Sequence, residues 1–214
     1  MSTPLTAQQT PATRRRERWP LLVHTAALLP LLVAIADLLL GRLTVNPIQD
    51  LTHRSGYTAL VLLVASLACT PISMVFGFKR VLTLRRPLGL YGFGYALVHM
   101  LIFVVVDFGL DITLIWQEVA EKRYILAGMA ALLLLIPLAI TSTSGWQRRL
   151  GRRWRLVHRL VYLAVPLAVI HYIWLVKADI REPLLYAALV ILLLLLRLGP
   201  LRRAITTWRR RLSS

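Results

Sequence analysis

The chain has 214 residues, of which 57% are hydrophobic and only 16% are charged, and its formal net charge is +17. A composition this apolar excludes a water-soluble globular protein, because too few polar residues remain to cover its surface. It also excludes a disordered chain, since disorder requires a low content of hydrophobic residues. We therefore expect a membrane protein.

Six long stretches contain no Asp, Glu, Lys or Arg. A bilayer core of about 30 Å requires roughly 20 residues of helix, so these stretches predict an all-α membrane protein with six transmembrane helices. The last stretch has only 14 residues, and we expect its helix to extend through Arg197, whose long stem carries the charge to the interface. In chain order the stretches are Pro20–Ala36, Ser55–Phe78, Leu88–Val106, Tyr124–Gln147, Leu160–Val176 and Pro183–Leu196.

Charged residues are distributed unequally between the two ends of these helices. The segment before Pro20, the loops Lys79–Arg86 and Arg148–Arg159, and the segment from Arg197 onward hold 20 of the 26 Lys and Arg residues. All of the acidic residues except Glu17 lie toward the opposite side. Because cytoplasmic loops carry the excess of Lys and Arg, this alternation predicts that both termini are cytoplasmic.

The same distribution argues against a nucleic-acid partner, because basic residues beside membrane helices ordinarily face lipid headgroups. We divide the chain into a basic cytoplasmic tail at 1–19, a six-helix membrane domain at 20–199 and a second basic cytoplasmic tail at 200–214. Neither tail is long enough to fold a flavin- or nicotinamide-binding domain. Cys69 is the only cysteine, which excludes a disulfide and the Cys-x-x-Cys-His motif of covalently attached heme.

Histidines are the ionisable residues that stand out within the predicted helices. His24 lies in the first helix, His99 in the third, and His158 and His171 in the fifth, whereas His53 lies in a loop. A single intramembrane histidine is ordinarily a neutral imidazole that is hydrogen-bonded to a neighbouring helix. Acidic residues lie only toward the helix ends, which argues against a proton or ion path through the membrane.

Two of the histidines are expected at similar depth. His99 lies 13 residues beyond Arg86, or about 20 Å along a helix. His171 lies 16 residues beyond Arg155, or about 24 Å. Both helices run outward from the cytoplasm, so the two imidazoles can face each other and fill both axial positions of a heme iron. An iron ligated in this way has no open site, and its chemistry is electron transfer.

An inner cofactor is less well defined. His158 lies near the cytoplasmic surface, 13 residues before His171, and the two point about 220° apart on a straight helix. The residue 13 positions before His99 is Arg86, so the third helix offers no matching ligand. An inner heme would need His24 or an exogenous ligand.

Two further features have alternative interpretations. Gly89, Gly92 and Gly94 in the third predicted helix either let a flat porphyrin approach the backbone or allow close helix packing. The longest outer loop, Asp107–Arg123, is rich in apolar side chains. It predicts a segment that lies on the outer surface or a docking patch for a partner.

Three strings of residues resemble a known family. They are NPIQDLTHRSGYTAL at Asn46–Leu60, RRPLGLYGFGYALVHM at Arg85–Met100 and TSTSGWQRRLGRRWRLVHRLVYLAVPLAVIHYIWLVK at Thr141–Lys177. They are similar to the MsrQ family, also called YedZ, within the ferric-reductase-like transmembrane group. The resemblance extends from about Trp19 to Arg203.

This resemblance implies a multi-pass protein of the bacterial inner membrane that carries heme b and FMN. It implies electron transfer to MsrP, a periplasmic molybdopterin enzyme that reduces methionine sulfoxide in oxidised proteins. His99, His158 and His171 fall on the histidines regarded as functional in the family. The wider ferric reductases carry two histidines on each of two helices, and this chain lacks one of the four, which leaves room for a flavin on the inner side.

We interpret the chain as an electron conduit that works within membrane lipid. Reducing equivalents enter near His158, from a cytosolic flavin reductase or from quinol, and reach an outer heme whose iron is ligated by His99 and His171. Such a chain is one subunit of an oxidoreductase and does not reduce methionine sulfoxide alone. Two other hypotheses are a proton-coupled transporter or channel that uses the intramembrane histidines, and an assembly or anchoring subunit.

Overall fold

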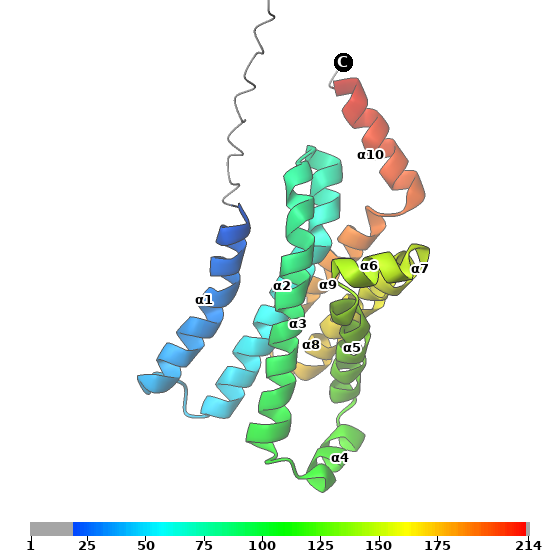
Figure 1. The fold of residues 1–214 in the computed structure, drawn as a ribbon. Helices are drawn as coiled ribbons and strands as arrows, with labels where there is room; N and C mark the ends of the chain where they lie inside the picture. Colours follow the sequence, from blue (N-terminus) through cyan, green and yellow to red (C-terminus); the bar gives the residue numbers. More distant parts are fainter. Residues whose placement is uncertain (1–18, 213–214) are drawn as a thin grey trace, which may run out of the picture.

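The structure is a computed structural model that describes residues 19–212, and most of the predicted tail at 1–19 lies outside the described residues. Figure 1 shows these residues as a bundle of helices, and the part of the chain that is described contains no strand. The predicted fold class, an all-α membrane protein, is confirmed. The α-helices are α1 Trp19–Leu39, α2 Pro47–Phe76, α3 Arg85–Leu101, α4 Ile112–Glu121, α5 Arg123–Ile140, α6 Ser144–Leu150, α7 Arg152–Val157, α8 Val161–Leu175, α9 Arg181–Leu195 and α10 Gly199–Leu212.

Five helical segments in the described residues are long and apolar enough to cross a bilayer, and a helix pair bent by 78° makes six if the pair is counted as one span. The outward faces of these segments expose many large apolar side chains, including Leu21, Leu133 and Leu185. A soluble protein rarely exposes so much apolar surface, whereas lipid accepts it. The segments are Leu21–Leu39, Pro47–Phe76, Lys79–Asp107, Arg123–Ile140 and Arg152–Leu175, with Arg181–Leu195 and Gly199–Ile205 as the bent pair.

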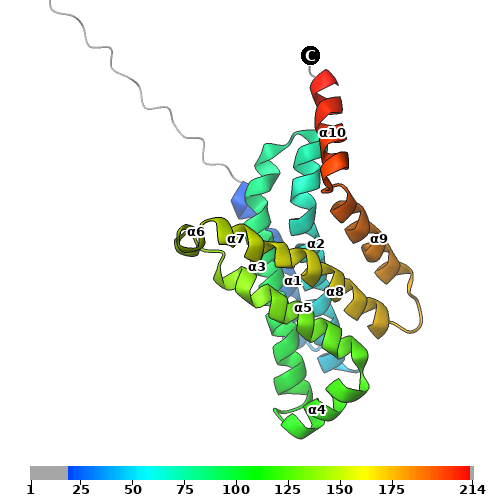
Figure 2. The ribbon, with the colours of Figure 1, turned by 90° about the vertical axis from the view of Figure 1, so that its right-hand side faces the viewer.

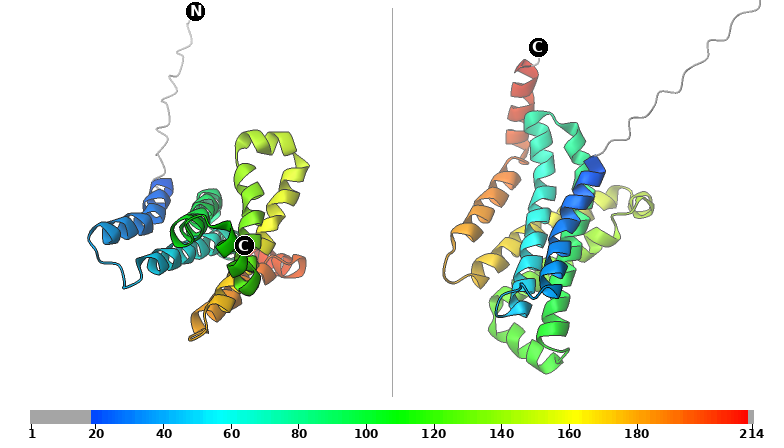
Figure 3. Two further views of the ribbon diagram at one scale, coloured as in Figure 1. Left: turned by 90° about the horizontal axis from the view of Figure 1, so that it is seen from below. Right: turned by 90° about the vertical axis from the view of Figure 1, so that its left-hand side faces the viewer.

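Two antiparallel helix pairs form the centre of the bundle. The most extensive helix contacts join α2 to α3 and α5 to α8 (Figures 1 and 2). Helices α1 and α9 lie at the periphery, where α1 packs against α2 and α3, and α9 packs against α8 (Figure 3). The hydrophobic core joins the two pairs and α9, and it contains Leu60, Leu63, Val64, Leu67, Leu135, Leu138, Ala164, Val165, Val169, Val190 and Leu193.

The basic and acidic loops lie at opposite ends of this bundle. The connection between α2 and α3, which carries Lys79 and Arg80 and is followed by Arg85 and Arg86 at the start of α3, lies toward one end together with α10, and α4 lies toward the other (Figures 1 and 2). The apolar outer loop therefore contains a helix, α4. Its N-cap is Asp111, whose carboxylate accepts the N–H groups of Thr113 and Leu114.

Helix α2 starts earlier than the charge-free stretch predicted. The Asn46 side chain accepts the Gln49 N–H at 3.1 Å, and Pro47 occupies the first helical position, where its missing N–H costs nothing. The predicted start at Ser55 is therefore wrong, and so is the assignment of His53 to a loop. His53 lies in the second turn of a membrane-spanning helix.

Paired charges explain this longer helix. Arg54 of α2 donates to Asp50 at 2.9 Å, one turn away, and to Asp37 of α1 at 2.6 Å. Charges near a helix end are tolerated when they are paired with one another. A prediction that ends each helix at the first charged residue therefore underestimates the length of α2.

The predicted extension of the last helix through Arg197 is also wrong. Helix α9 ends at Leu195, and Arg197 lies in the turn that precedes α10. Its guanidinium donates to the Tyr162 hydroxyl at 2.8 Å and to the backbone carbonyl of Leu67. The Arg197 guanidinium therefore binds groups within the bundle, whereas the length of its side chain predicted a position at the membrane interface.

Other connections are more ordered than the sequence indicated. Helix α5 ends at Ile140 rather than Gln147, and the Thr143 hydroxyl caps the next helix by accepting the Trp146 N–H. The basic loop Arg148–Arg159 contains α7 and the end of α6, and the described part of the predicted tail at 200–214 belongs to α10. The described residues of these basic segments are therefore largely helical.

Candidate functional site

A cavity of about 440 Å³ lies between the two central helix pairs, toward the end of the bundle that carries α4. Most of its lining is apolar, and both His99 of α3 and His171 of α8 contribute to it. This volume is in the range of cofactor and ligand sites. The structure therefore brings together the two histidines for which the sequence predicted similar depth.

The imidazoles of His99 and His171 are direct neighbours. Their ring centroids lie 6.0 Å apart, and their planes are nearly perpendicular, at 84°. The two side chains come from different helix pairs, so the cavity between the pairs is flanked by one imidazole from each. Two nitrogen ligands from the protein are the set that heme iron needs, because the porphyrin supplies the other donors.

Each of these imidazoles has one nitrogen already engaged. His99 Nδ1 lies 2.8 Å from the carbonyl oxygen of Thr52, and His171 Nδ1 lies 2.7 Å from that of Tyr124. A carbonyl can only accept, so Nδ1 carries the hydrogen in both rings and the lone pair of the neutral imidazole is on Nε2. Metal-ligating histidines typically donate their other N–H to such a partner. The donor set therefore fits a metal ligated through Nε2.

The cavity is lined by corresponding positions from the two helix pairs. Most lining residues form pairs that are 72 residues apart in the sequence. The two hydrogen bonds show the same repeat, since 47 residues separate donor and acceptor in each. The paired positions include Gly56 with Gly128, Ala59 with Ala131, Leu60 with Leu132, Leu63 with Leu135, Ala96 with Ala168, and His99 with His171.

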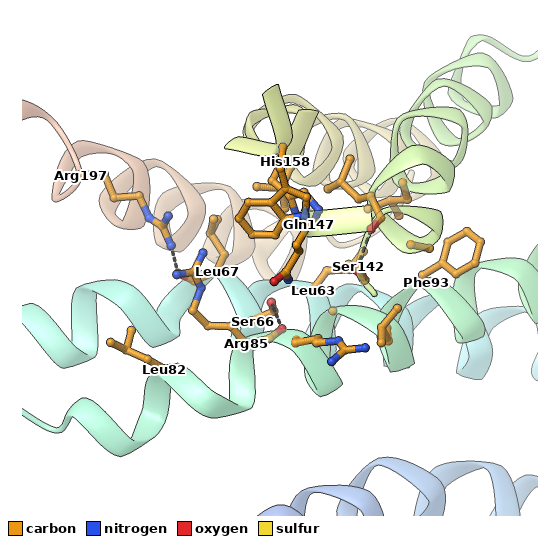
Figure 4. Close-up of a pocket in the computed structure, with 18 residues that line it drawn as sticks. Leu63, Ser66, Leu67, Leu82, Arg85, Phe93, Ser142, Gln147, His158 and Arg197 are labelled. Carbon is orange, nitrogen blue, oxygen red and sulfur yellow. Dashed lines mark hydrogen bonds between the residues drawn. The ribbon is translucent and has the colours of Figure 1, made fainter. Parts of the chain in front are cut away.

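A second cavity, of about 310 Å³, lies toward the basic end of the bundle and is lined by His158 (Figure 4). The Thr141 hydroxyl donates to the Pro137 carbonyl at 2.6 Å, so it accepts from His158 Nε2, 3.2 Å away. His158 thus carries its hydrogen on Nε2, in contrast to His99 and His171. Its ring stacks on Trp154 with 4.0 Å between centroids.

Three arginines line this inner cavity: Arg85, Arg86 and Arg197. The lining residues include no carboxylate. The Nε atom of Arg197 is buried without a hydrogen-bond partner among the described residues. Cationic groups and polar atoms without partners fit an anionic group better than a neutral one. The guanidinium groups of these three arginines are therefore candidates for binding phosphate or carboxylate.

The other histidines lie elsewhere. His24 Nδ1 is 2.9 Å from the Tyr91 hydroxyl, and His24 lines neither cavity. It is therefore not placed to pair with His158, the arrangement that an inner heme would have needed. His53 lines the outer cavity and stacks on Tyr57. In the described residues, no group of three or more His, Cys, Asp or Glu side chains could hold a metal ion.

The glycines near the histidines are not those that the sequence singled out. A side chain on Gly92 would meet Leu63 at 2.8 Å, so this glycine serves helix packing, whereas Gly94 has open space around it. Gly56 and Gly128 instead adjoin His99 and His171. A signal for them was present, because Gly-x-x-Ala-Leu-x-x-Leu begins at both positions, 43 residues before a histidine each time.

The comparison with known proteins decides the family. A protein of Rhodospirillum rubrum named "Protein-methionine-sulfoxide reductase heme-binding subunit MsrQ" is 46% identical over 179 residues, which cover 83% of this chain and 86% of the relative. The chain belongs to the MsrQ family. The family that the sequence motifs predicted is confirmed.

Other relatives agree with this MsrQ assignment. Proteins with the same name from Xanthomonas axonopodis pv. citri and Xanthomonas campestris pv. campestris are 45% and 48% identical, over 81% and 70% of this chain and 82% and 68% of the relatives. Residues 55–169 match the family described as ferric reductase like transmembrane component. This match contains α3 and α5 and the larger parts of α2 and α8, and it ends two residues before His171. No solved structure matches the chain.

Proposed function

We propose that this MsrQ-family chain is the heme b subunit of a two-component methionine sulfoxide reductase, in which His99 and His171 would hold the iron of an outer heme. One observation carries the proposal: two imidazoles from separate helix pairs flank one cavity with their centroids 6.0 Å apart, each with its Nδ1–H on a backbone carbonyl. The relatives' printed name, which includes heme binding, supports the same cofactor.

The residues around the outer cavity have two roles: they orient the two imidazoles, and they keep water out of the heme site. The carbonyls of Thr52 and Tyr124 fix the rotation of the two imidazoles, which keeps each Nε2 lone pair available. Apolar side chains from all four central helices exclude water from the space between them. A bis-histidine heme, when bound, supplies one-electron transfer and offers no open site for substrate.

The test is the visible absorption spectrum of the purified chain. The wild-type chain should show a Soret band that sharpens on reduction, and His99→Ala and His171→Ala should each lose most of it while the protein remains in the membrane. His24→Ala is the matched control, because His24 is a membrane histidine outside both cavities and should retain the band. A wild-type chain without a Soret band would favour the transporter or anchoring hypotheses.

On the inner side, we propose FMN in the cavity that contains His158, Trp154 and the three arginines. The phosphate of FMN matches Arg85 and Arg86, and Trp154 offers an aromatic surface for the flavin ring. The His158 tautomer supports a flavin over a second heme, since its Nε2 is occupied by Thr141. His158 then helps to bind the flavin.

Flavin retention tests this site. The chain purified in mild detergent should release FMN on denaturation, and Arg86→Gln should reduce the flavin-to-protein ratio because it removes a charged phosphate ligand. Arg155→Gln is the control, because Arg155 is an exposed arginine of the same basic end that does not line the cavity. Equal flavin in wild type and in Arg86→Gln would exclude Arg86 from the site, and a flavin-free wild type would exclude FMN.

We propose further that the chain is a multi-pass protein of the bacterial inner membrane, with its membrane domain at 20–199 between two cytoplasmic basic segments. Electrons then pass outward to MsrP, the periplasmic molybdopterin reductase. Either a cytosolic flavin reductase or membrane quinol can supply the inner side. Heme reduction in inside-out vesicles, measured with reduced flavin plus flavin reductase and separately with quinol, distinguishes these two donors.

A further inference from the structure

Two glycines occupy equivalent places beside the two outer histidines. Gly56 follows Thr52 by four residues in α2, and Gly128 follows Tyr124 by four residues in α5. In an α-helix, the carbonyl of residue i accepts the N–H of residue i+4. Thr52 and Tyr124 are thus the residues whose carbonyls point at Gly56 and Gly128, and these same carbonyls also accept the Nδ1–H groups of the histidines.

A side chain at these positions would cover the carbonyl. The Cα–Cβ bond of a helical residue tilts toward the helix N-terminus, which is the direction of the carbonyl four residues earlier. A Cβ on Gly56 would lie 2.9 Å from Nδ1 and 3.0 Å from Cε1 of His99. A Cβ on Gly128 would lie 2.7 Å from Nδ1 and 3.0 Å from Cε1 of His171. These distances are shorter than ordinary van der Waals contacts.

From this geometry we infer that Gly56 and Gly128 are positioning residues that seat the imidazoles of His99 and His171 on their backbone carbonyls. The inference rests on the proposed function, because it assigns these glycines a role in presenting Nε2 to the outer heme. Any larger residue pushes the ring off the carbonyl, which releases Nδ1–H and changes the direction of the Nε2 lone pair.

The internal repeat is a second observation that supports the inference, because the same contact occurs in both halves of the chain. The arrangement of carbonyl, glycine and histidine occurs twice, at positions 52, 56 and 99 and again 72 residues later. In both copies the glycine begins the string Gly-x-x-Ala-Leu-x-x-Leu, whose Ala and Leu residues line the cavity. The two sets of carbonyl, glycine and histidine are therefore equivalent halves of one binding site.

The holoprotein experiment compares Gly56→Ala and Gly128→Ala with Gly94→Ala. Alanine is a better helix former than glycine, so helix propensity does not explain a loss. Loss of a hydrogen-bond partner to a metal ligand typically weakens metal binding roughly 10- to 100-fold, and we expect a comparable loss of heme retention. The remaining heme should show a shifted midpoint potential and altered low-spin g-values. Gly94→Ala, which has open space around it, should match the wild type in all three measurements.

A double-mutant cycle separates seating from a structural role. Gly128→Ala is compared in the wild-type and His171→Ala backgrounds, with full chains expressed under heme limitation. If Gly128 seats the ring, the loss of thermal stability that Gly128→Ala causes should disappear once the ring is absent. A loss of the same size in both backgrounds would mean that Gly128 is needed for helix packing, which overturns the inference.

The outcomes for the two proposals differ. A wild-type chain without a Soret band overturns the proposed function, whereas the double-mutant cycle still measures whether the glycine and the ring are in contact. A wild-type chain with heme, together with glycine variants of unchanged heme retention, midpoint potential and g-values, overturns the inference about Gly56 and Gly128 alone.

Discussion

The hydroxyl of Tyr95 in α3 is inserted into the backbone ladder of α1 at Leu31. It accepts the Leu31 N–H at 3.0 Å and donates to the Ala27 carbonyl at 2.7 Å. Ala27 and Leu31 are four residues apart and would otherwise bond directly to each other. Pro30 lies within the same helix turn, and the two hydrogen bonds of the Tyr95 hydroxyl connect the peripheral helix α1 to α3.

Tyr95→Phe should therefore destabilise the protein through two backbone groups at once. Removing the hydroxyl leaves the partly buried Leu31 N–H and the buried Ala27 carbonyl without this partner, at a cost of about 1–3 kcal/mol each. Denaturant unfolding in detergent measures the change. Tyr91→Phe is the control, because among the described residues the Tyr91 hydroxyl bonds to the exposed His24 side chain and to no backbone group. Equal stability of the two variants would show that the bridge contributes nothing.

The orientation of the chain can be tested with reporter fusions. Alkaline phosphatase fused after Leu212 should be inactive and a fluorescent protein there should be fluorescent, because the basic segments favour the cytoplasmic side. Phosphatase inserted at Gly109, between α3 and α4, should be active. The opposite pattern would reverse the topology and with it the proposed direction of electron transfer.

Methionine sulfoxide reduction should require the partner enzyme. The purified chain with dithionite and a methionine sulfoxide peptide should show no turnover, because an iron held by both proposed ligands, His99 and His171, would leave no site for substrate. Turnover should appear when the molybdopterin reductase is added. The same mixture with His171→Ala corrects for direct reduction of the partner by dithionite. Peptide reduction by the isolated chain would refute this division of labour.

The junction between α4 and α5 should depend on pH only in the alkaline range. A hydrogen bond from Lys122 to Glu118 raises the pKa of Lys122 above its ordinary 10.5. A pKa raised on folding gives stability that is complete below the unfolded pKa and is lost as pH rises through the folded pKa.

Lys122→Met should therefore lower stability equally at pH 6 and pH 9. The Lys122 side chain is 42% exposed, so solvent screens the ion pair. We expect the loss of stability to be about 0.3–0.5 kcal/mol, as is typical of such pairs. Above the raised pKa, the difference should vanish. Thermal unfolding across this pH range checks the expectation, with the exposed Lys177→Met as control. A difference that grows above pH 10.5 would contradict it.

The sequence alone determined the class of fold, because a bilayer imposes constraints that are local in the chain. Helix length follows from bilayer thickness, and the charges of each loop predict the side of the membrane on which it lies. The approach of His99 to His171 also followed from local counting, since rise per residue converts position into depth along two helices that run the same way. The Gly-x-x-Ala-Leu-x-x-Leu repeat is also present in the sequence, at Gly56 and Gly128.

Only the tertiary structure decided what depends on partners distant in the chain. Arg54 of α2 pairs with Asp37 on α1, which allows a charged residue within this membrane-spanning helix, and Arg197 lies outside α9, where the Leu67 carbonyl, 130 residues earlier, accepts its guanidinium. The importance of Gly56 and Gly128 is likewise invisible in their own helices. Each glycine matters only because a neighbouring helix places an imidazole ring against it. The packing of α3 on α2 and of α8 on α5 sets that contact.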